Sequence, residues 1–283
     1  MRYFHASGLP GPLRPGNDPR ACRGQRLRHT RALPSRSHLH PLFLAFVNPS
    51  TTFDPDRVRA ITLDLDDTLW PTWPTIARAE AALQKWLTEN APATAALCAA
   101  PGALREVRTH MNTHRPDLAH DMSALRRESI RLVLCRAGDD PALAEPAFEV
   151  FFAERQRVEF FDDALPALEF LASRFPVVAV SNGNADVHRV GIGRHFRGAV
   201  SARSLGVGKP DRRIFDAAAA TAGVAPQAVL HVGDDAHLDG VGALNAGMQV
   251  AWVNREGHSW EHAPHQPHLT VRELRSLCEL LGR

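Results

Sequence analysis

Short apolar runs alternate along the chain with longer segments whose apolar residues recur at helical spacing. Four runs have the length of buried strands, at residues 60–65, 177–180, 228–232 and 249–253. Helical spacing is evident at residues 165–174, 211–222 and 239–246. Glycines directly after the last two segments, Gly223 and Gly247, are typical of helix C-terminal caps. This alternation predicts an α/β fold, a doubly wound parallel sheet with helices on both faces.

The stretch between the first and second predicted strands has a different pattern. It shows helical spacing at residues 76–89, 103–113, 123–137 and 142–158, and no run typical of a strand. We therefore predict a helical domain at residues 75–161, inserted into a sheet domain that is formed by residues 56–74 and 162–283.

The N-terminal segment has neither pattern. Residues 1–50 contain eight arginines and one acidic residue, Asp18, and five prolines fall within residues 1–40. This composition predicts that residues 1–55 are a disordered basic tail, or upstream sequence read as protein with a true start near Val47. An organelle transit peptide is the alternative that an arginine-rich, acid-poor start leaves open.

Composition places the rest of the chain among ordinary globular proteins. The 283 residues are 44% hydrophobic and 23% charged, and no apolar run is long enough to span a membrane. Residues 51–283 contain 25 basic and 30 acidic side chains, so no nucleic-acid partner is expected for the main body. The cysteines form no CxxC pair, which excludes a cysteine zinc ribbon and indicates a reducing, cytoplasmic location. The oligomeric state stays open.

Two acidic residues, Asp64 and Asp66, close the first predicted strand. Strand alternation would place them on the same side, where neighbouring carboxylates repel each other unless a cation is present. Active sites of open α/β sheets lie at such strand ends, so the pair suggests a nucleophile and a general acid–base that share a metal. The alternative is a solvated acidic turn.

Polar residues also follow the second strand and a later loop. Ser181 and Asn182 could hold phosphate oxygens, although an Asn-Gly turn explains the same residues. Lys209, one of only two lysines in the chain, could place a point charge on a phosphoryl group or be a solvated loop residue. Proline after this lysine excludes a Walker A loop.

A second acidic group follows the strand at residues 228–232. Asp234 and Asp239 carry hard oxygen ligands of the kind that Mg²⁺ prefers. A helix N-terminus enriched in acids is the alternative, and it explains Asp239 better than Asp234.

Taken together, these motifs resemble those of the haloacid dehalogenase superfamily of phosphohydrolases. The shared features are DxDxT at residues 64–68, a serine after the second strand, a downstream lysine, and GDxxxxD at residues 233–239. The resemblance covers about residues 57–280 and implies a Rossmann-like core with a helical cap of the C1 type after the first strand. ITLDLDDTLW, VAVSNGNADV and GKPDRRIF further resemble bacterial phosphatases of flavin mononucleotide and of 5-amino-6-(5-phospho-D-ribitylamino)uracil, a riboflavin-pathway intermediate.

The resemblance implies a role for each motif residue. Asp64 would be the nucleophile that forms an aspartyl-phosphate, and Asp66 the general acid–base. Mg²⁺ would be bound by Asp64, the backbone carbonyl of Asp66 and Asp234, while Asp239 orients that shell or binds through water.

The remaining motif residues would complete the phosphate site. Ser181, Asn182 and Lys209 would hold the phosphoryl oxygens of a small phosphate ester. Thr68 would organise the loop, and we expect Trp70 to pack between the two domains rather than to contact substrate.

Other functions remain compatible with these motifs. Dehalogenases of the superfamily lack the second acid, so Asp66 favours a phosphatase. A phosphatase of sugar phosphates or phosphoglycolate, a phosphomutase and a non-catalytic scaffold are the alternatives.

Overall fold

The computed structural model describes residues 52–100 and 102–282. Its strands form a parallel sheet. Within this part of the chain six strands pair in the order β3-β2-β1-β4-β5-β6, and each pairing is parallel. The strands are β1 (Ala60–Leu63), β2 (Val177–Ser181), β3 (Gly198–Ser201), β4 (Val229–Gly233), β5 (Gln249–Val253) and β6 (Leu269–Val271). The strand order reverses between β1 and β4, which confirms the doubly wound α/β fold, and such a reversal is where these sheets bind ligands.

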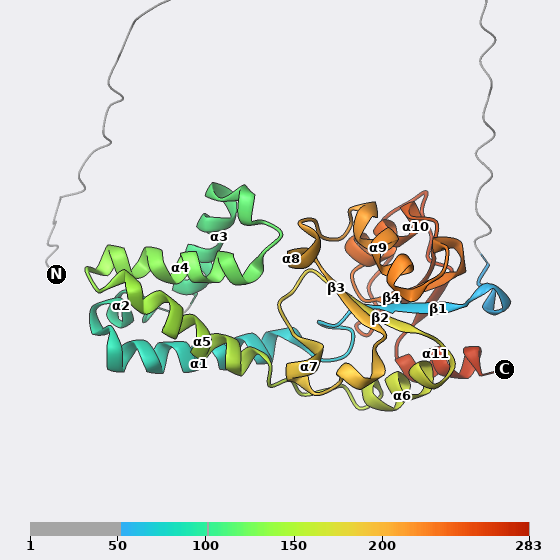
Figure 1. Cartoon of the computed structure of the whole chain (residues 1–283), viewed down its shortest axis with the longest axis horizontal. Coiled ribbons are helices and arrows are strands. Elements are labelled where there is room, and N and C mark those ends of the chain that lie inside the picture. Colours follow the sequence, from blue (N-terminus) through green and yellow to red (C-terminus); the bar gives the residue numbers. More distant parts are fainter. Residues whose placement is uncertain (1–51, 101, 283) are drawn as a thin grey trace, which may run out of the picture. The chain divides into compact units, whose positions relative to one another are not determined.

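Helices cover both faces of this sheet (Figure 1). On one face, α6 (Ala164–Arg174) and α11 (Leu274–Leu281) pack against alternate strand residues such as Leu63. On the other face, α9 (Arg212–Ala222) and α10 (Gly242–Asn245) pack against the intervening strand residues, such as Val178 and Val180. Because both faces are covered, the strands read as apolar runs rather than as alternating patterns.

Shorter elements connect these strands and helices. They are α7 (Val187–Val190), α8 (Ala202–Leu205), the 3₁₀ turns Pro55–Arg57, Gly193–His195 and Pro226–Ala228, and a π-helical segment, Ala236–Val241.

Between β1 and α6 the described residues are mostly helical. They form α1 (Thr72–Asn90), α2 (Pro92–Leu97), α3 (Ala103–His114), α4 (Met122–Ala137) and α5 (Ala144–Arg155), with 3₁₀ turns at Pro116–Leu118 and Pro141–Leu143. We call residues 72–155 the helical segment. Its helices enclose an apolar cluster of their own, in which Leu83 and Leu87 of α1 lie against Phe148 and Phe151 of α5. Figure 1 shows α1 and α5 side by side.

The first strand is shorter than the sequence predicts. β1 ends at Leu63 rather than at residue 65, and the backbone then turns. Asp67 adopts a left-handed conformation with a φ of 59°, and its N–H donates to the Trp70 carbonyl at 2.8 Å. Asp64 and Asp66 therefore lie beyond the strand, so strand alternation does not describe how their side chains point.

Other differences concern weak patterns. β3 and β6 were not predicted, because each buries a single residue and has no apolar run. The helix predicted at 239–246 is a π-helical segment followed by α10, and the one predicted at 142–158 begins as a 3₁₀ turn and ends at Arg155.

Most of the predicted tail lies outside the described residues. Its last part does not behave as a tail, because Asp54 exchanges two hydrogen bonds with the Gln249 side chain at 2.8 and 2.9 Å. Phe53 packs against the core as well, so the boundary at residue 55 is late. Among the described residues, no helix is long and apolar enough to cross a membrane.

Candidate active site

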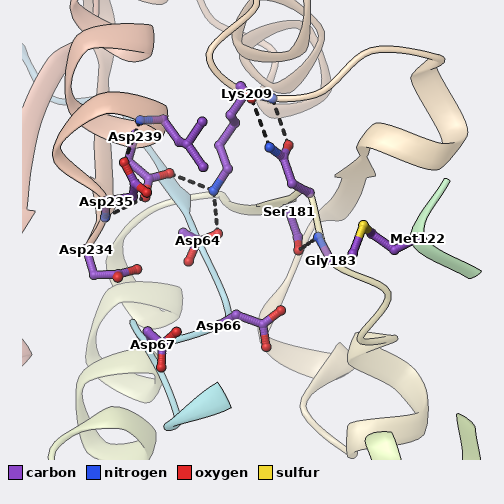
Figure 2. Close-up of a pocket in the computed structure, with 12 residues that line it drawn as sticks. Asp64, Asp66, Asp67, Met122, Ser181, Gly183, Lys209, Asp234, Asp235 and Asp239 are labelled. Carbon is purple, nitrogen blue, oxygen red and sulfur yellow. Dashed lines mark hydrogen bonds and ion pairs between the residues drawn. The ribbon is translucent and has the colours of Figure 1, made fainter. Parts of the chain in front are cut away.

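The motif residues meet in a cleft of about 270 Å³ at the carboxyl ends of β1, β2 and β4. Figure 2 shows them around this cleft, with Met122 at the start of α4 on its far side. The predicted residues that line it are Asp64, Asp66, Ser181, Asn182, Lys209, Asp234 and Asp239. The fold thus brings together residues that are up to 175 positions apart in the sequence, from Asp64 to Asp239.

Lys209 lies between two buried carboxylates. Its ammonium donates to Asp64 and, at 2.6 Å, to Asp239 (Figure 2). Burial alone would lower the pKa of Lys209, but Asp239 and Asp64 outweigh it and raise that pKa above its ordinary value. Burial would likewise raise the pKa of Asp239, yet Lys209 and His231 lower it to about 2. This half of the cleft therefore holds a charged ion pair.

A buried relay supports Asp239 from behind. Nε2 of His231 lies 3.0 Å from the Asp239 carboxylate, and its Nδ1 lies 2.9 Å from the Thr62 hydroxyl. Burial lowers the pKa of His231, so the ring is neutral. Because an ionised carboxylate can only accept, Nε2 must carry the proton and Nδ1 must accept from Thr62. The relay fixes the orientation of Asp239 and, through it, of Lys209.

Thr68 connects the carboxylates of Asp64 and Asp234. Its hydroxyl lies 3.2 Å from Asp64 and 3.0 Å from Asp234. Burial, with the neighbouring Asp239 carboxylate, raises the pKa of Asp234 to about 7, and burial raises the pKa of Asp64 well above its ordinary value. Burial is the main cause of both shifts, and the neighbouring carboxylates add to it.

The carboxylates of Asp64, Asp234 and Asp239 form a group that fits a divalent cation. Oxygens of Asp64, Asp234 and Asp239 lie within 4.8 Å of one another, and three carboxylates face one ammonium. Hard carboxylate oxygens are the ligands that Mg²⁺ prefers. Asp239 already accepts from Lys209, His231 and the Asp235 N–H at 3.1 Å, which leaves Asp64 and Asp234 freer to bind a metal.

Asp66 lies at the other side of the cleft, next to the helical segment. The Trp70 indole donates to it at 2.9 Å, and Nη2 of Arg155 donates to its two oxygens at 2.6 and 2.7 Å. Trp70 is fully buried in the apolar cluster of the sheet domain, and the expected packing between the two domains stays a prediction. Arg155 was not predicted, since it lies 89 residues from Asp66 and ends a helix whose glutamates also pair with other arginines, Arg127 and Arg157.

The two residues that follow β2 have different surroundings. Ser181 lines the cleft, and its Oγ accepts from the Gly183 N–H at 2.9 Å. The Asn182 side chain instead holds the Lys209 backbone, donating to its carbonyl at 2.9 Å and accepting from its N–H at 2.7 Å. Asn182 thus positions Lys209, and a phosphate contact from its side chain stays a prediction.

Two acids without an expected role are capping residues. Asp67 accepts from the N–H of Thr72 at the start of α1, and Asp235 accepts from two N–H groups of the π-helical segment.

Two other residues of the site, Thr62 and His231, were not predicted, although the sequence contains a signal for them. Thr62 and His231 are polar positions inside otherwise apolar strands, a recognisable mark of a buried polar contact.

The family model of haloacid dehalogenase-like hydrolases matches residues 58–247. The chain belongs to this family. It is 31% identical over 233 residues to the 5-amino-6-(5-phospho-D-ribitylamino)uracil phosphatase YigB of Escherichia coli (strain K12), an alignment that covers 80% of this chain and 97% of that protein. The chain is also 34% identical over 158 residues to the phosphoserine phosphatase of Thermus thermophilus, covering 54% of this chain and 63% of that one.

A solved structure with a different name is similar as well. The 2-haloacid dehalogenase from Pseudomonas syringae pv. Tomato superposes with a TM-score of 0.74 and is 40% identical, covering 80% of this chain and 99% of that one. Proteins named as phosphatases and a protein named as a dehalogenase are thus among those similar to this chain.

Proposed function

We propose that this hydrolase removes phosphate from small phosphate monoesters with Mg²⁺ and an aspartyl-phosphate intermediate on Asp64. The observation that carries the proposal is Asp66, a second carboxyl group at the same cleft as Asp64, held on a side from which it can face a leaving group. Expulsion of an alkoxide needs a proton donor at that place, and expulsion of a halide does not.

The proposed reaction has two steps. A carboxylate oxygen of Asp64 attacks phosphorus in line, and the P–O bond to the leaving group breaks while Asp66 gives its proton to the departing alkoxide. In the second step Asp66 takes a proton from water, whose oxygen attacks phosphorus and releases Asp64 and inorganic phosphate. Lys209 keeps Asp64 oriented, and Ser181 and Lys209 face the charge that develops on the phosphoryl oxygens.

Asp64, the Asp66 carbonyl and Asp234 would hold the metal. When bound, Mg²⁺ supplies the positive charge that offsets repulsion between the Asp64 carboxylate and the phosphate dianion. The raised pKa values of Asp64 and Asp234 support this proposal, because burial and neighbouring carboxylates disfavour the ionised forms that a bound cation would stabilise.

The substrate we propose carries a ribityl phosphate, as in flavin mononucleotide or the ribitylaminouracil phosphate. Support comes from the E. coli relative and from a second cleft of about 260 Å³ that also borders Gly183. Hydroxyl, amide and guanidinium groups of Ser123, Asn184 and Arg203 line that cleft, a set suited to a hydroxylated chain. Ser123 belongs to the helical segment and accepts from Asn184 at 3.3 Å, so we propose that this segment acts as a cap over the substrate.

A dehalogenase is the second candidate, favoured by the name of the Pseudomonas syringae relative. One panel separates the two: phosphate release from flavin mononucleotide, the ribitylaminouracil phosphate, phosphoserine, phosphoglycolate, several sugar phosphates and a nucleotide, beside chloride release from 2-chloropropionate. Each reaction is run with Mg²⁺ and with EDTA.

We expect phosphate release that EDTA abolishes, with the highest kcat/KM for the two ribityl phosphates. A profile led by sugar phosphates would keep the chemistry and reject the substrate. Chloride release without phosphate release would reject the phosphatase, and phosphate transfer between sugar positions without net release would indicate a mutase.

A further inference from the structure

Asp66 is held from the helical segment by a buried arginine. Arg155 is the last residue of α5 and is 2% exposed, and both hydrogen bonds found for its guanidinium go from Nη2 to the Asp66 oxygens. The Trp70 indole donates to Asp66 from a second direction. Three contacts thus determine where this carboxyl group lies.

The ion pair is poorly suited to a purely stabilising role. Burying a guanidinium is costly unless its donors are matched, and replacing such a pair by apolar residues is often neutral or stabilising. Within residues 52–100 and 102–282, Nη1 of Arg155 is buried and has no hydrogen-bond partner. The chain therefore retains a buried charge that is incompletely satisfied and whose identified contacts serve one residue, Asp66. Buried polar groups without a hydrogen-bond partner are expected mainly where function requires them.

The surrounding backbone is arranged to hold this pair. Gln156, the residue after Arg155, donates to the Asn184 carbonyl at 3.3 Å and accepts from the Asp186 N–H at 2.7 Å. The end of α5 is thereby fixed to the loop after β2. In that loop a Cβ on Gly183 would overlap an oxygen of Asp66 and lie 3.6 Å from Nη2 of Arg155, so glycine makes room for the pair.

We propose that Arg155 is a positioning residue that aims Asp66 at the leaving group and ties the acid–base to the end of the helical segment. The proposal rests on the proposed function, in which Asp66 protonates an alkoxide. Since Arg155 would act through Asp66, its loss should slow only reactions that need this proton.

The test compares leaving groups in the full-length enzyme with Mg²⁺. kcat/KM reports the steps through departure of the leaving group, so it is measured for an alkyl phosphate (flavin mononucleotide) and for 4-nitrophenyl phosphate, whose leaving group needs little protonation. The variants are Arg155→Met, Arg155→Lys and Asp66→Asn. Arg157→Met is the matched control, because the Arg157 side chain is 75% exposed and pairs with Glu154 at the surface.

We expect Arg155→Met to lower kcat/KM about 10- to 100-fold for the alkyl phosphate and less than about 3-fold for the aryl phosphate. Arg155→Lys keeps a positive charge at the site and should recover part of the loss, and Arg157→Met should match wild type for both substrates. Melting temperatures identify any variant that is unfolded, and Arg155→Lys then carries the comparison.

A double variant separates positioning from other roles. In the Asp66→Asn background, Arg155→Met should cause no further loss, because the residue through which it acts is gone. Equal losses for both substrates, or a further loss in that background, would overturn the proposal and assign Arg155 to substrate binding or to stability. If Asp66→Asn itself shows no preference between leaving groups, the proposed function fails rather than this inference.

Discussion

The two halves of the cleft are built differently. The half around Asp64 comes from the strand ends of the sheet domain, where Lys209, Asp239 and His231 form a fully buried chain of contacts. The half around Asp66 depends on Arg155 at the end of α5. The proposed nucleophile, Asp64, is thus placed by contacts within the sheet domain, whereas the proposed acid–base, Asp66, is held in part by the helical segment.

This difference separates two requirements of the proposed reaction. The covalent step needs a nucleophile that keeps its geometry throughout the cycle, and a rigid buried network provides it. The proton transfer needs a group whose placement can depend on the segment that covers the substrate. Variants on the Asp64 side should therefore affect all substrates, and variants on the Asp66 side should discriminate between leaving groups.

The largest effect is expected at the nucleophile. Asp64→Asn should lower kcat by at least about 10³-fold for every phosphate ester, because an amide oxygen cannot form the intermediate. The matched control is Asp67→Asn, an acid of the same cleft whose capping bond to Thr72 an amide oxygen can keep. Steady-state phosphate release checks both, and near-normal activity of Asp64→Asn would exclude covalent catalysis by this residue.

The next largest effect is expected at Lys209. Lys209→Met should lower kcat/KM about 10²- to 10³-fold for alkyl and aryl phosphates alike, since the ammonium orients Asp64 and faces the phosphoryl group. Lys85→Met, at the only other lysine of the chain and exposed on α1, should have no effect. A loss restricted to poor leaving groups would contradict the assignment of Lys209 to the nucleophile side.

A smaller and selective effect is expected at Gly183. The added methyl of Gly183→Ala would displace Asp66, so kcat/KM should fall about 10-fold for an alkyl phosphate and much less for 4-nitrophenyl phosphate. The same pair of kinetic measurements checks it. An equal loss for both substrates would mean that the substitution disturbs Ser181 or the phosphate site instead.

The smallest effect concerns stability without metal. Burial and Asp239 raise the pKa of Asp234 to about 7, so the folded protein binds this proton more tightly than the unfolded chain does. The stability that this group contributes is therefore greatest at low pH and is lost as the pH rises through about 7. In EDTA, Asp234→Asn should melt about 5 °C above wild type at pH 8, with a smaller difference at pH 5.5.

Thermal melting with and without Mg²⁺ completes that prediction. Mg²⁺ should raise the melting temperature of wild type and of the control Asp162→Asn, an exposed acid, but not that of Asp234→Asn. Equal stabilisation of all three proteins would place the metal elsewhere.

The sheet and its motif residues could be predicted because both follow from local patterns. Apolar runs such as 228–232 report burial on both faces, and the acids that follow them lie at strand ends whatever the details of packing. The same reasoning failed for the paired acids, where β1 ends at Leu63 and the left-handed Asp67 redirects the chain. Alternation holds only while a strand continues.

Contacts between distant segments could not be predicted. Arg155 is the one arginine of α5, but arginines outside that helix, Arg127 and Arg157, form ion pairs with its glutamates. Nothing in the sequence distinguishes the arginine that reaches Asp66 from these others. The contact between the Asn182 amide and the Lys209 backbone could not be predicted either, because spacing along the chain does not specify which polar groups meet. The sequence therefore reveals the nucleophile side more fully than the acid–base side.

The most direct test of the central claim is to trap the covalent intermediate. Wild-type enzyme and Asp64→Asn are mixed with a ³²P-labelled phosphate ester and Mg²⁺, quenched in acid within the first turnover, and mapped by peptide. We expect a hydroxylamine-sensitive label on the peptide that contains Asp64 in wild type and no label in the variant. Phosphate release by wild type without any labelled peptide, or a label that persists in Asp64→Asn, would contradict an aspartyl-phosphate at this residue.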